Sequence, residues 1–399
     1  MVRKLKNLGH FIQAFLAVIF YRFPASHLTV IGVTGTDGKT TTVHLVGEIL
    51  KKAGFKVAMI STLGAWFGEK EIKTGFHVTT PSPFLLQKLL QQIVNRGFTH
   101  VVLEATSHGF DQHRLLGCNF KVGVITNITH EHLDYHKTFE DYLKAKAKLF
   151  RKVELAVLNC DDESYEYLKS KIKSEKAKII TYGVKNEADL TPKTFPFKGK
   201  LLGEYNLYNC LAAIGVAQGL GIKKEIIRIA VEGFSGLPGR LEKISEGQDF
   251  QVFIDFAHTP AAFKEVLKTV RNQTKGEIIH VFGCTGDRDK TKRPMMGEIS
   301  AKLSDKIILT HEDTYHEDLK KIINEIEVGV KKGGKILGQT YWKIFDRSCA
   351  IILAINMAKS KDTVLITGVG HQKTLNLGGQ EIPWSDQEIS KEAIKERLK

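Results

Sequence analysis

A glycine-rich segment near the N-terminus ends in a lysine and three threonines, the composition of a phosphate-binding loop. Residues 32–42 read GVTGTDGKTTT and lie between an apolar run and a helical pattern. In such a loop the glycines turn backbone N–H groups toward a phosphate, and the helix N-terminus adds its dipole. The amine of Lys39 would neutralise the β- and γ-phosphates, and the hydroxyl of Thr40 would bind Mg²⁺. The predicted nucleotide contacts in this loop are Gly35, Thr36, Asp37, Gly38, Lys39, Thr40 and Thr41.

The phosphate loop alone does not say which reaction a nucleotide would serve. Val33 stands where a strict Walker A motif has glycine, so the loop is a variant of that motif. A motor, a kinase, a GTPase and a ligase could all share it. Residues elsewhere in the chain must therefore decide between these classes.

Eight further motifs follow the loop in order along the chain. They read TTP at 79–81, EATSHGFDQHR at 104–114, TNITHEHLDYH at 126–136, GEYNLYN at 203–209, PGR at 238–240, DFAHTP at 255–260, GCTGDRD at 283–289 and GVGH at 368–371. In this order and spacing, the chain resembles the Mur ligase superfamily, and within it the MurE-type UDP-N-acetylmuramoyl-tripeptide synthetases. The resemblance implies an ATP-dependent, ADP-forming amino acid ligase that acts in the cytoplasm on peptidoglycan precursors.

Joining a carboxylate to an amine requires that the carboxylate be activated. The resemblance implies that it attacks the γ-phosphate of ATP, and that an amine then attacks the resulting acyl phosphate. This chemistry calls for cations around the phosphate and for exclusion of water. Lys39 and Arg240 would supply the positive charge. Glu104 follows an apolar strand and would hold Mg²⁺ at the carboxyl edge of the sheet, and the resemblance implies that His132 holds a second Mg²⁺.

A stretch that reads YLKAKAKLF places three lysines at alternate positions of an expected helix. From the residues alone this is a basic helix that buries Tyr142. The resemblance implies that the lysine four residues after this tyrosine, Lys146, is carbamylated by CO₂ and acts near Mg²⁺. Lys144 and Lys148 are the alternatives in the same helix. Carbamylation needs a neutral amine, so the site must lower the pKa of this lysine.

The same resemblance assigns the remaining site residues. It places Asn206 and Asn209 at the adenine, although two asparagines at a helix start can equally cap the helix. Asp255 and His258 are assigned to the nucleotide as well. The predicted catalytic residues are Lys39, His132, Lys146 and Arg240. The predicted metal-site residues are Thr40, Glu104, His132 and Lys146. The predicted substrate contacts are Thr79, Thr80, Ser107, Gln112, Arg114, Asp313, Gly368 and His371.

Two features depart from the resemblance. MurE-type ligases carry an N-terminal domain that holds a uridine nucleotide, and only 31 residues precede Gly32, which leaves both a UDP-linked and a lipid-linked carrier open. An Asp-Asn-Pro-Arg motif, whose arginine holds the distal carboxylate of diaminopimelate, is replaced by EDTYH at residues 312–316, and Gln372 stands where glutamate is usual. Without that bidentate guanidinium the amino acid is not assigned. Lysine or another amine-bearing residue is open.

Apolar strands alternate with helical stretches along nearly the whole chain, which is typical of parallel α/β architecture. We expect strands at 28–35, 100–105, 121–127 and 155–159, a helix at 40–53, and a helix after Pro81 with Ser82 as its N-cap. A second series has strands at 252–256, 278–283, 306–309 and 363–367. We therefore predict a basic, apolar segment at 1–27, a P-loop central domain with a mostly parallel sheet at 28–236, and a C-terminal Rossmann-like α/β domain at 237–399, with a cleft between the two domains.

The charge and the cysteines limit the partners. The chain has 399 residues, a formal net charge of +14 and five cysteines. The lysines are spread along the chain without interleaved aromatic residues, so we interpret them as solvated surface and expect no nucleic acid partner. The single cysteines fit a reducing cytosol and argue against a zinc ribbon or a disulfide framework. We expect a cytoplasmic monomer whose substrates are an amino acid and an anionic, peptide-bearing carrier.

The N-terminal segment combines cations with an apolar run. Arg3, Lys4 and Lys6 precede apolar residues 11–20, a run too short to span a bilayer, which needs about 20 residues. The run leads into a strand rather than a cleavage site, so a signal peptide is disfavoured. We expect a buried or surface-lying helix, and weak membrane-surface contact is open.

Three alternative functions remain at this stage. A folylpolyglutamate synthase-like or lipid-II-acting ligase would share the loop, although the DFAHTP and GCTGDRD motifs favour the MurE type. A nucleic-acid-dependent P-loop ATPase would use the net charge of +14. A scaffold that binds nucleotide without turnover is disfavoured, because the residues with roles only in chemistry or phosphate binding are retained. These residues are Lys39, Glu104, His132, Arg240 and Asp255.

Overall fold

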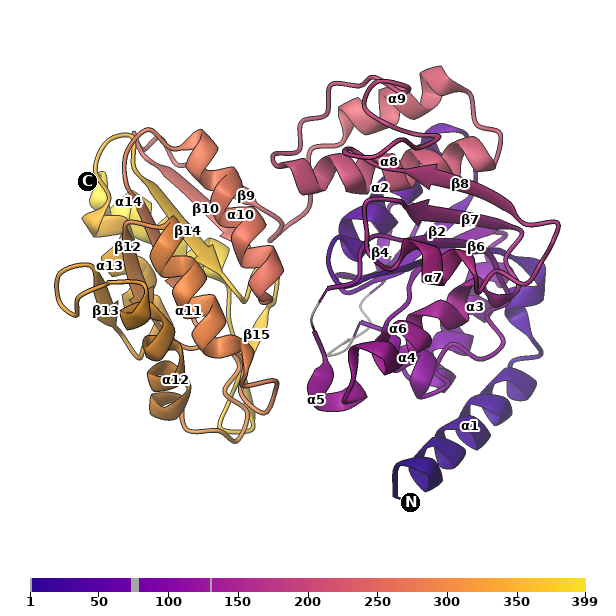
Figure 1. Cartoon of the computed structure of the whole chain (residues 1–399), viewed down its shortest axis with the longest axis horizontal. Coiled ribbons are helices and arrows are strands. Elements are labelled where there is room, and N and C mark those ends of the chain that lie inside the picture. The colour runs from indigo at the N-terminus through magenta and orange to yellow at the C-terminus, as the bar shows by residue number, and fades with distance from the viewer. Residues whose placement is uncertain (1, 73–78, 130) are drawn as a thin grey trace. The chain divides into compact units, whose positions relative to one another are not determined.

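The computed structural model describes residues 2–72, 79–129 and 131–399, so His130 of the TNITHEHLDYH motif lies outside the described residues. The chain forms two compact units (Figure 1). The first comprises Met1–Leu201 and Tyr205–Ser235, and the second comprises Leu202–Glu204 and Gly236–Lys399. The predicted α/β class with mostly parallel sheets is confirmed.

The first unit is built on an eight-stranded sheet in the order β4-β3-β2-β5-β1-β6-β7-β8. Only the β2–β3 and β3–β4 pairs are antiparallel among these strands. Because β1 lies between β5 and β6 with parallel register, the segments that follow these three strands emerge at one edge of the sheet, where such sheets bind ligands. The strands are β1 (Thr29–Thr34), β2 (Val57–Ser61), β3 (Gly64–Phe67), β4 (Lys70–Ile72), β5 (His100–Glu104), β6 (Phe120–Ile125), β7 (Leu155–Asn159) and β8 (Lys178–Tyr182).

Helices surround this sheet (Figure 1). They are α1 (Val2–Phe20), α2 (Lys39–Lys52), α3 (Pro83–Asn95), α4 (Ser107–Asp111), α5 (Leu133–His136), α6 (Phe139–Ala147), α7 (Tyr165–Lys169), α8 (Glu204–Gly219) and α9 (Lys224–Gly233), with 3₁₀ turns at Pro24–His27 and Lys148–Arg151. Ser82 is the N-cap residue of α3 as predicted, but its side chain makes no capping hydrogen bond. In α3, Leu86, Leu90 and Ile93 are fully buried against the core, as their helical spacing predicts.

The second unit has a six-stranded sheet in the order β13-β12-β11-β14-β10-β9, parallel except for β9, and a β15–β16 hairpin. The predicted strands of the second series correspond to β10, β11, β12 and β14. The strands are β9 (Glu242–Ile244), β10 (Gln251–Asp255), β11 (Ile278–Phe282), β12 (Lys306–Leu309), β13 (Tyr341–Lys343), β14 (Thr363–Thr367), β15 (Thr374–Leu377) and β16 (Gln380–Pro383). The helices are α10 (Pro260–Gln273), α11 (Lys292–Leu303), α12 (Leu319–Lys332), α13 (Arg347–Met357) and α14 (Asp386–Arg397).

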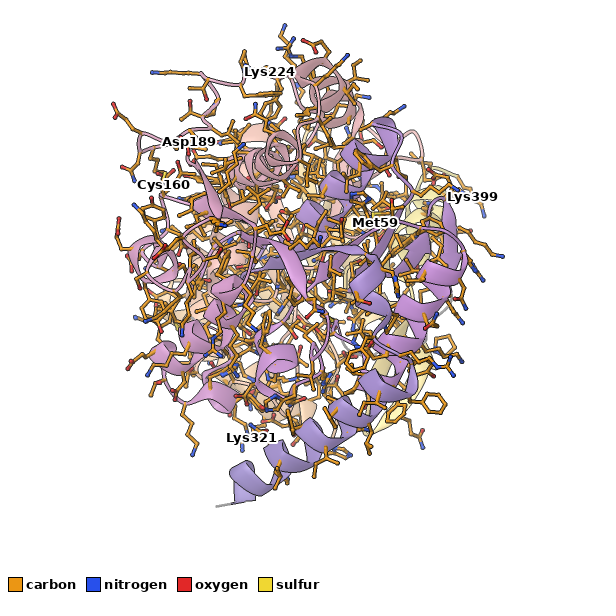
Figure 2. All side chains as sticks on the ribbon, turned by 90° about the vertical axis from the view of Figure 1, so that its right-hand side faces the viewer. Met59, Cys160, Asp189, Lys224, Lys321 and Lys399 are labelled. Carbon is orange, nitrogen blue, oxygen red and sulfur yellow. The ribbon has the colours of Figure 1, made fainter. Side chains whose placement is uncertain are left out.

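All five cysteines are free thiols. Cys160 lies at the periphery of the first unit (Figure 2). Among the described residues, no helix combines the length and the apolarity that crossing a membrane requires.

Candidate active site

The phosphate loop connects β1, in the middle of the first sheet, to the start of α2. Gly35 and Gly38 have φ angles of 149° and 81°, which L residues with a side chain rarely adopt. A Cβ atom on Gly35 would lie 1.8 Å from Thr126 Oγ1, and one on Gly38 would lie 2.2 Å from Asn209 Oδ1. Both positions therefore require glycine, and the loop backbone is free to approach a ligand closely.

Residues that follow β6 hold the loop in shape. The backbone N–H of Thr36 donates to the carbonyl of Asn127 at 2.8 Å, and that of Asp37 donates to Asn127 Oδ1 at 3.0 Å. Thr126 Oγ1 donates to the carbonyl of Asp37 at 2.7 Å. These contacts fix the loop before any ligand arrives, which reduces the entropy lost on binding.

Lys39 begins α2 and provides the positive charge of the loop. Its amine donates to the carbonyl of Thr36 at 2.6 Å and lies 4.0 Å from Glu104 Oε1. A preformed glycine turn, a helix N-terminus and a positioned ammonium group are the features that bind phosphate. The residues of this loop therefore fit the phosphates of a nucleotide.

Glu104 ends β5 and is 1% exposed. Its Oε2 accepts from Thr40 Oγ1 at 3.0 Å and from both the N–H and the hydroxyl of Thr62, at 2.9 and 3.0 Å. Thr62 was not foreseen from the sequence, because it is remote from every motif and reaches the site only through the pairing of β2 with β5.

The oxygen atoms around Glu104 are suited to a nucleotide-bound Mg²⁺. Within the described part of the chain, no group of three or more His, Cys, Asp or Glu side chains could hold a metal ion by itself. Mg²⁺ commonly uses one or two carboxylates and completes its octahedron with phosphate oxygens and water. The Glu104 carboxylate and the Thr40 hydroxyl match that use, and they do not match an all-protein metal cage.

Lys146 lies in α6 and is 2% exposed. Its amine donates to the carbonyl of Gly35 at 2.5 Å and lies 4.5 Å from the centre of the Tyr142 ring. Burial, reinforced by the nearby charge of Lys39, holds the pKa of the Lys146 amine well below its usual value. A lowered pKa favours the neutral form of this buried amine, and a neutral amine is a nucleophile.

Lys144 and Lys148 are in different surroundings. Lys144 forms an exposed ion pair with Glu140 at 2.7 Å, and Lys148 Nζ donates to the carbonyl of Phe110 at 3.4 Å. Lys146, by contrast, donates a hydrogen bond to the phosphate loop.

His132 lies in a cluster of aromatic rings with φ of 57°. The His108 ring is 4.7 Å from it in a perpendicular arrangement, and the Tyr142 ring is 6.1 Å away. His136 also contacts Tyr142, at 5.4 Å. His132 and Lys146 thus meet the same tyrosine, whose hydroxyl lies 3.0 Å from Thr36 Oγ1 in the phosphate loop. His108 and His136 were not expected in this cluster from their positions in the sequence.

The substrate residues predicted in the first unit form short chains of contacts that lead to Glu104. Thr79 Oγ1 lies 3.0 Å from Thr62 Oγ1, which is bonded to Glu104. Thr80 Oγ1 lies 2.9 Å from Thr106 Oγ1, and Arg114 donates to the Thr80 carbonyl at 2.9 Å.

Two more predicted substrate residues lie on or beside α4. The Ser107 hydroxyl is buried and has no hydrogen-bond partner among the described residues. Gln112 donates to the Tyr135 hydroxyl at 3.3 Å. Asn209 in α8 contacts the phosphate loop through Thr42, at 3.4 Å, and its amide donates to Asn206 Oδ1 at 3.0 Å.

In the second unit, three predicted residues gather around one phenylalanine. The Arg240 guanidinium lies 4.6 Å from the centre of the Phe256 ring, and the rings of His258 and His371 are each 4.9 Å from it. Asp255 holds the backbone of this group, because its carboxylate accepts from the N–H groups of residues 241 and 257, each at 2.6 Å. Phe256 was not singled out from the sequence, since an aromatic residue after a strand is ordinarily core.

A second group in this unit centres on the segment that follows β12. Asp313 accepts from the Asn376 N–H at 2.8 Å and from Gln372 Nε2 at 3.3 Å, and burial raises its pKa. Glu312 is 3% exposed, accepts from Thr285 Oγ1 at 3.0 Å, and leaves Oε1 without a partner among the described residues. Burial raises the pKa of Glu312 to about 7.

Gly368, another predicted substrate residue, lies directly against this acid. It has φ of 104°, and a Cβ atom there would meet Glu312 Oε1 at 2.0 Å. The two departures from the family pattern, the segment 312–316 and Gln372 in place of glutamate, are in contact, because Gln372 donates a hydrogen bond to Asp313 of that segment.

The fold and the site define a class of protein. A phosphate loop after the central parallel strand, with a buried carboxylate after the adjacent strand, is the arrangement of P-loop α/β proteins that bind a nucleotide with Mg²⁺.

Comparison with known proteins is more specific. The Mur ligase middle domain matches residues 33–217, and the Mur ligase, glutamate ligase domain matches residues 239–370. A relative from Geobacillus thermodenitrificans is 38% identical over 96% of this chain and 82% of its own length, and one from Clostridium acetobutylicum is 36% identical over 97% and 82%. Both are named as UDP-N-acetylmuramoyl-L-alanyl-D-glutamate–2,6-diaminopimelate ligases. The chain belongs to the Mur ligase family.

Solved structures agree with this assignment. A structure of a UDP-N-acetylmuramoyl-L-alanyl-D-glutamate–2,6-diaminopimelate ligase is 31% identical, with a TM-score of 0.64 over 93% of this chain and 79% of that one. Folylpolyglutamate synthase from Mycobacterium tuberculosis has a TM-score of 0.73 over 90% of this chain and 91% of its own, but is 16% identical. The second likeness shows a shared fold alone.

Proposed function

We propose that this protein is an ATP-dependent, ADP-forming ligase that joins an amino acid to the carboxylate of a muramoyl-peptide-type carrier. The observation that carries the proposal is the hydrogen bond between Thr40 Oγ1 and the buried Glu104 carboxylate at the head of the phosphate loop. The relatives named as diaminopimelate ligases, at 36–38% identity over nearly the whole chain, support it.

Bound ATP would supply the phosphoryl group that activates the carboxylate, and bound Mg²⁺ would neutralise phosphate charge. The chain's own residues would position and stabilise these groups. Backbone N–H groups at the start of α2 would bind phosphate oxygens, and the Lys39 ammonium would stabilise the charge that develops on them. Glu104 and Thr40 would hold the metal. We propose that Asn206 and Asn209 contact the adenine, and that Arg240, Asp255 and His258 make further contacts to the nucleotide.

We also propose that Lys146 is carbamylated. Its neutral amine would attack the carbon of CO₂, form an N–C bond and lose a proton, leaving a carbamate with one negative charge. Two observations support this: the amine is buried, and its lowered pKa favours the neutral form. Together with His132, which shares the Tyr142 contact, the carbamate would help hold a second Mg²⁺.

The identity of the amino acid is proposed only by class. The segment 312–316 offers two carboxyl groups and no guanidinium, so an amino acid with a second amine is favoured over one with a distal carboxylate. Asp313, Gly368 and His371 would contact this substrate. Thr79, Thr80, Ser107, Gln112 and Arg114 would contact the carrier peptide.

The test is an ADP-release assay with Mg²⁺ and ATP. The acceptors are UDP-muramoyl-dipeptide and its lipid-linked equivalent, each combined with a panel of amino acids that includes lysine and diaminopimelate. We expect ADP release only when an acceptor and an amino acid with a second amine are both present, and loss of release in Lys39→Ala. ATP turnover that DNA or RNA stimulates, and that ignores amino acids, would overturn the proposal in favour of a nucleic-acid-dependent ATPase.

A further inference from the structure

The helix α1 has two dissimilar faces. Ala14, Ala17 and Val18 are at most 3% exposed, and Val18 packs against the backbone at Gly117. The opposite side, called here the α1 face, consists of large apolar residues that are 39–69% exposed. These residues are Leu8, Phe11, Ile12, Phe15, Leu16, Ile19 and Phe20.

Contacts at both ends hold α1 on the first unit. Asn7 donates to Asp111 Oδ2 at 3.4 Å, and the Phe11 ring lies 5.4 Å from His113. At the other end the Phe20 ring lies 6.3 Å from Phe84 of α3. Phe11 and Phe20 thus lie at the margins of the α1 face, and the rest of that face is the outer side of a docked helix. Figure 2 looks onto the side of the molecule that carries α1, and Figure 1 shows its N-terminal turns extending past the neighbouring elements.

The apolar surface continues beyond α1. Phe84 is 38% exposed and Phe23 is 51% exposed. The Phe84 ring contacts the Phe20 ring, and Phe23 follows Phe20 closely in the sequence. Single exposed apolar residues are normal on proteins, but a continuous apolar strip marks an interaction site.

The charged residues on α1, on the turn that follows it and on α3 are all basic, and Asp111, which accepts from Asn7 near the N-terminal end of α1, is an acidic neighbour. Residues 1–36 contain no Asp or Glu, and neither does α3. Lys6 and Arg22 are exposed at the two ends of the α1 face, and Lys88 is exposed one helical turn after Phe84. Between Lys6 and Arg22 the exposed residues of α1 are all uncharged.

We propose that α1 lies flat on an anionic membrane surface, with the α1 face at the boundary between headgroups and acyl chains. An amphipathic helix with bulky apolar residues on one side and cations at its margin is the kind of helix that binds in this way. Lys6, Arg22 and Lys88 would meet lipid phosphates. The inference does not depend on the proposed ligase reaction.

A second copy of the chain is a poorer occupant. In a two-fold symmetric contact the same surface faces itself, so the cations at the ends of one α1 face would approach the cations at the ends of the other. Neither α1 nor α3 supplies an acidic residue to pair with them. Lipid phosphates provide the missing negative charge.

The test is co-sedimentation of the full chain with vesicles of phosphatidylglycerol mixed equally with phosphatidylcholine, compared with phosphatidylcholine alone. We expect binding to the anionic vesicles that weakens as salt is raised. Phe15→Asp should reduce binding by at least about tenfold, because a charge replaces a ring that would be buried in the membrane. The triple change Lys6→Glu, Arg22→Glu and Lys88→Glu should reduce it by at least about fivefold for each cation, because each change removes an attraction and adds a repulsion.

Ile229→Asp is the matched control, since Ile229 is 62% exposed on α9 and should not affect binding. Ile12→Gln combined with Leu16→Gln is a milder second variant of the α1 face, in case Phe15→Asp unfolds. ADP release by each variant without vesicles reports on the ligase separately. Equal binding to neutral vesicles, unchanged binding of a folded α1-face variant, or a dimer that Phe15→Asp dissociates without vesicle binding would each overturn the inference.

Discussion

Lys146 is buried against the phosphate loop without a hydrogen-bonded carboxylate among the contacts described here. Replacing it with methionine removes a poorly solvated amine but keeps the volume, so the thermal midpoint should not fall. Turnover should nevertheless fall by about 10²–10³-fold, because the group that would help hold Mg²⁺ is lost. ADP release and thermal unfolding of Lys146→Met measure the two effects separately.

The control for Lys146 is its neighbour on the exposed side of α6. Lys144→Ala removes a surface ion pair and should leave turnover within about twofold of normal. In Lys146→Ala, which leaves a cavity, a short-chain carboxylate such as acetate should restore part of the activity. Full activity of Lys146→Ala without added carboxylate would refute the carbamate.

Glu312 gives a pH dependence of stability with a defined sign. Its pKa is about 7 in the folded chain against the ordinary 4.5, so between these values the folded state keeps a proton that the unfolded state has lost. Stability from this group is complete below pH 4.5 and is lost as the pH rises through 7. In Glu312→Gln, the thermal midpoint of the second unit, which contains this residue, should therefore fall less steeply as the pH rises across this range.

The useful quantity for Glu312 is the difference between the slopes of wild type and variant. The raised pKa of Asp313 contributes in the same direction and is present in both proteins. Glu175→Gln makes the same chemical change at an exposed position and should leave the slope unaltered. A parallel pair of curves for wild type and Glu312→Gln would show that this carboxyl is not buried in solution.

Thr40 and Glu104, which belong to motifs at the ends of strands, were predicted to share one metal site. The structure brings the two side chains within hydrogen-bonding distance, and their role as metal ligands stays a prediction. Thr62 and Phe256 carry no local signal, because their roles arise from strand pairing and from packing between distant segments. Tyr142 was predicted to be buried, and it is, but its contact with Thr36 of the phosphate loop was not predicted. Such residues cannot be recognised until the sheet order is known.

At the scale of elements, a buried ion pair fixes the carboxyl edge of the second sheet. Arg347 begins α13 and Asp386 begins α14, and both side chains are 0% exposed with Arg347 Nη2 2.7 Å from Asp386 Oδ2. The same guanidinium donates to the carbonyls of His311 at 3.0 Å and Thr367 at 2.9 Å. It therefore holds the segments that carry Glu312 and Gly368.

Arg347→Met should destabilise the second unit by about 3–5 kcal/mol, because it leaves the Asp386 carboxylate buried and unpaired. Adding Asp386→Leu should recover part of this stability but not the activity, since the bonds to His311 and Thr367 stay broken. Chemical denaturation and ADP release measure the two quantities. Lys302→Met, which breaks a largely exposed pair with Glu298, should cost less than about 1 kcal/mol. Equal losses for the buried and the exposed pair would contradict the argument.

Elements were predictable from the sequence to different degrees. The central strands of both sheets were predicted because continuous apolar runs are distinctive of strands buried on both faces. The β2–β3–β4 meander and the β15–β16 hairpin were not predicted. The strands β2 and β3 are largely buried but have only five and four residues, and β4, β15 and β16 are short and partly exposed, so none of them carries a strong pattern. The short helices α4 and α5 were also missed, because four or five residues contain little helical periodicity.

At the scale of the whole molecule, each unit has a hydrophobic core of its own, one formed within residues 25–168 and the other within residues 244–394. We therefore expect two thermal transitions in calorimetry. Arg347→Met should lower only the transition of the second unit and thereby identify it. The remaining transition belongs to the unit that contains the phosphate loop.

A non-hydrolysable ATP analogue with Mg²⁺ should raise the transition temperature of the first unit, because a ligand stabilises the state that binds it. At one hundred times its Kd, the ligand adds about 2.7 kcal/mol to the free energy of unfolding. Removing Mg²⁺ with a chelator should shrink this shift, and Lys39→Ala should abolish it. If Arg240 and Asp255 also bind the nucleotide, the transition temperature of the second unit rises as well. Arg240→Ala should then abolish the rise for the second unit and leave the rise for the first unit unchanged. A nucleotide that moves only the second transition would contradict the assignment of the phosphate loop, since its Gly35, Gly38 and Lys39 all belong to the first unit.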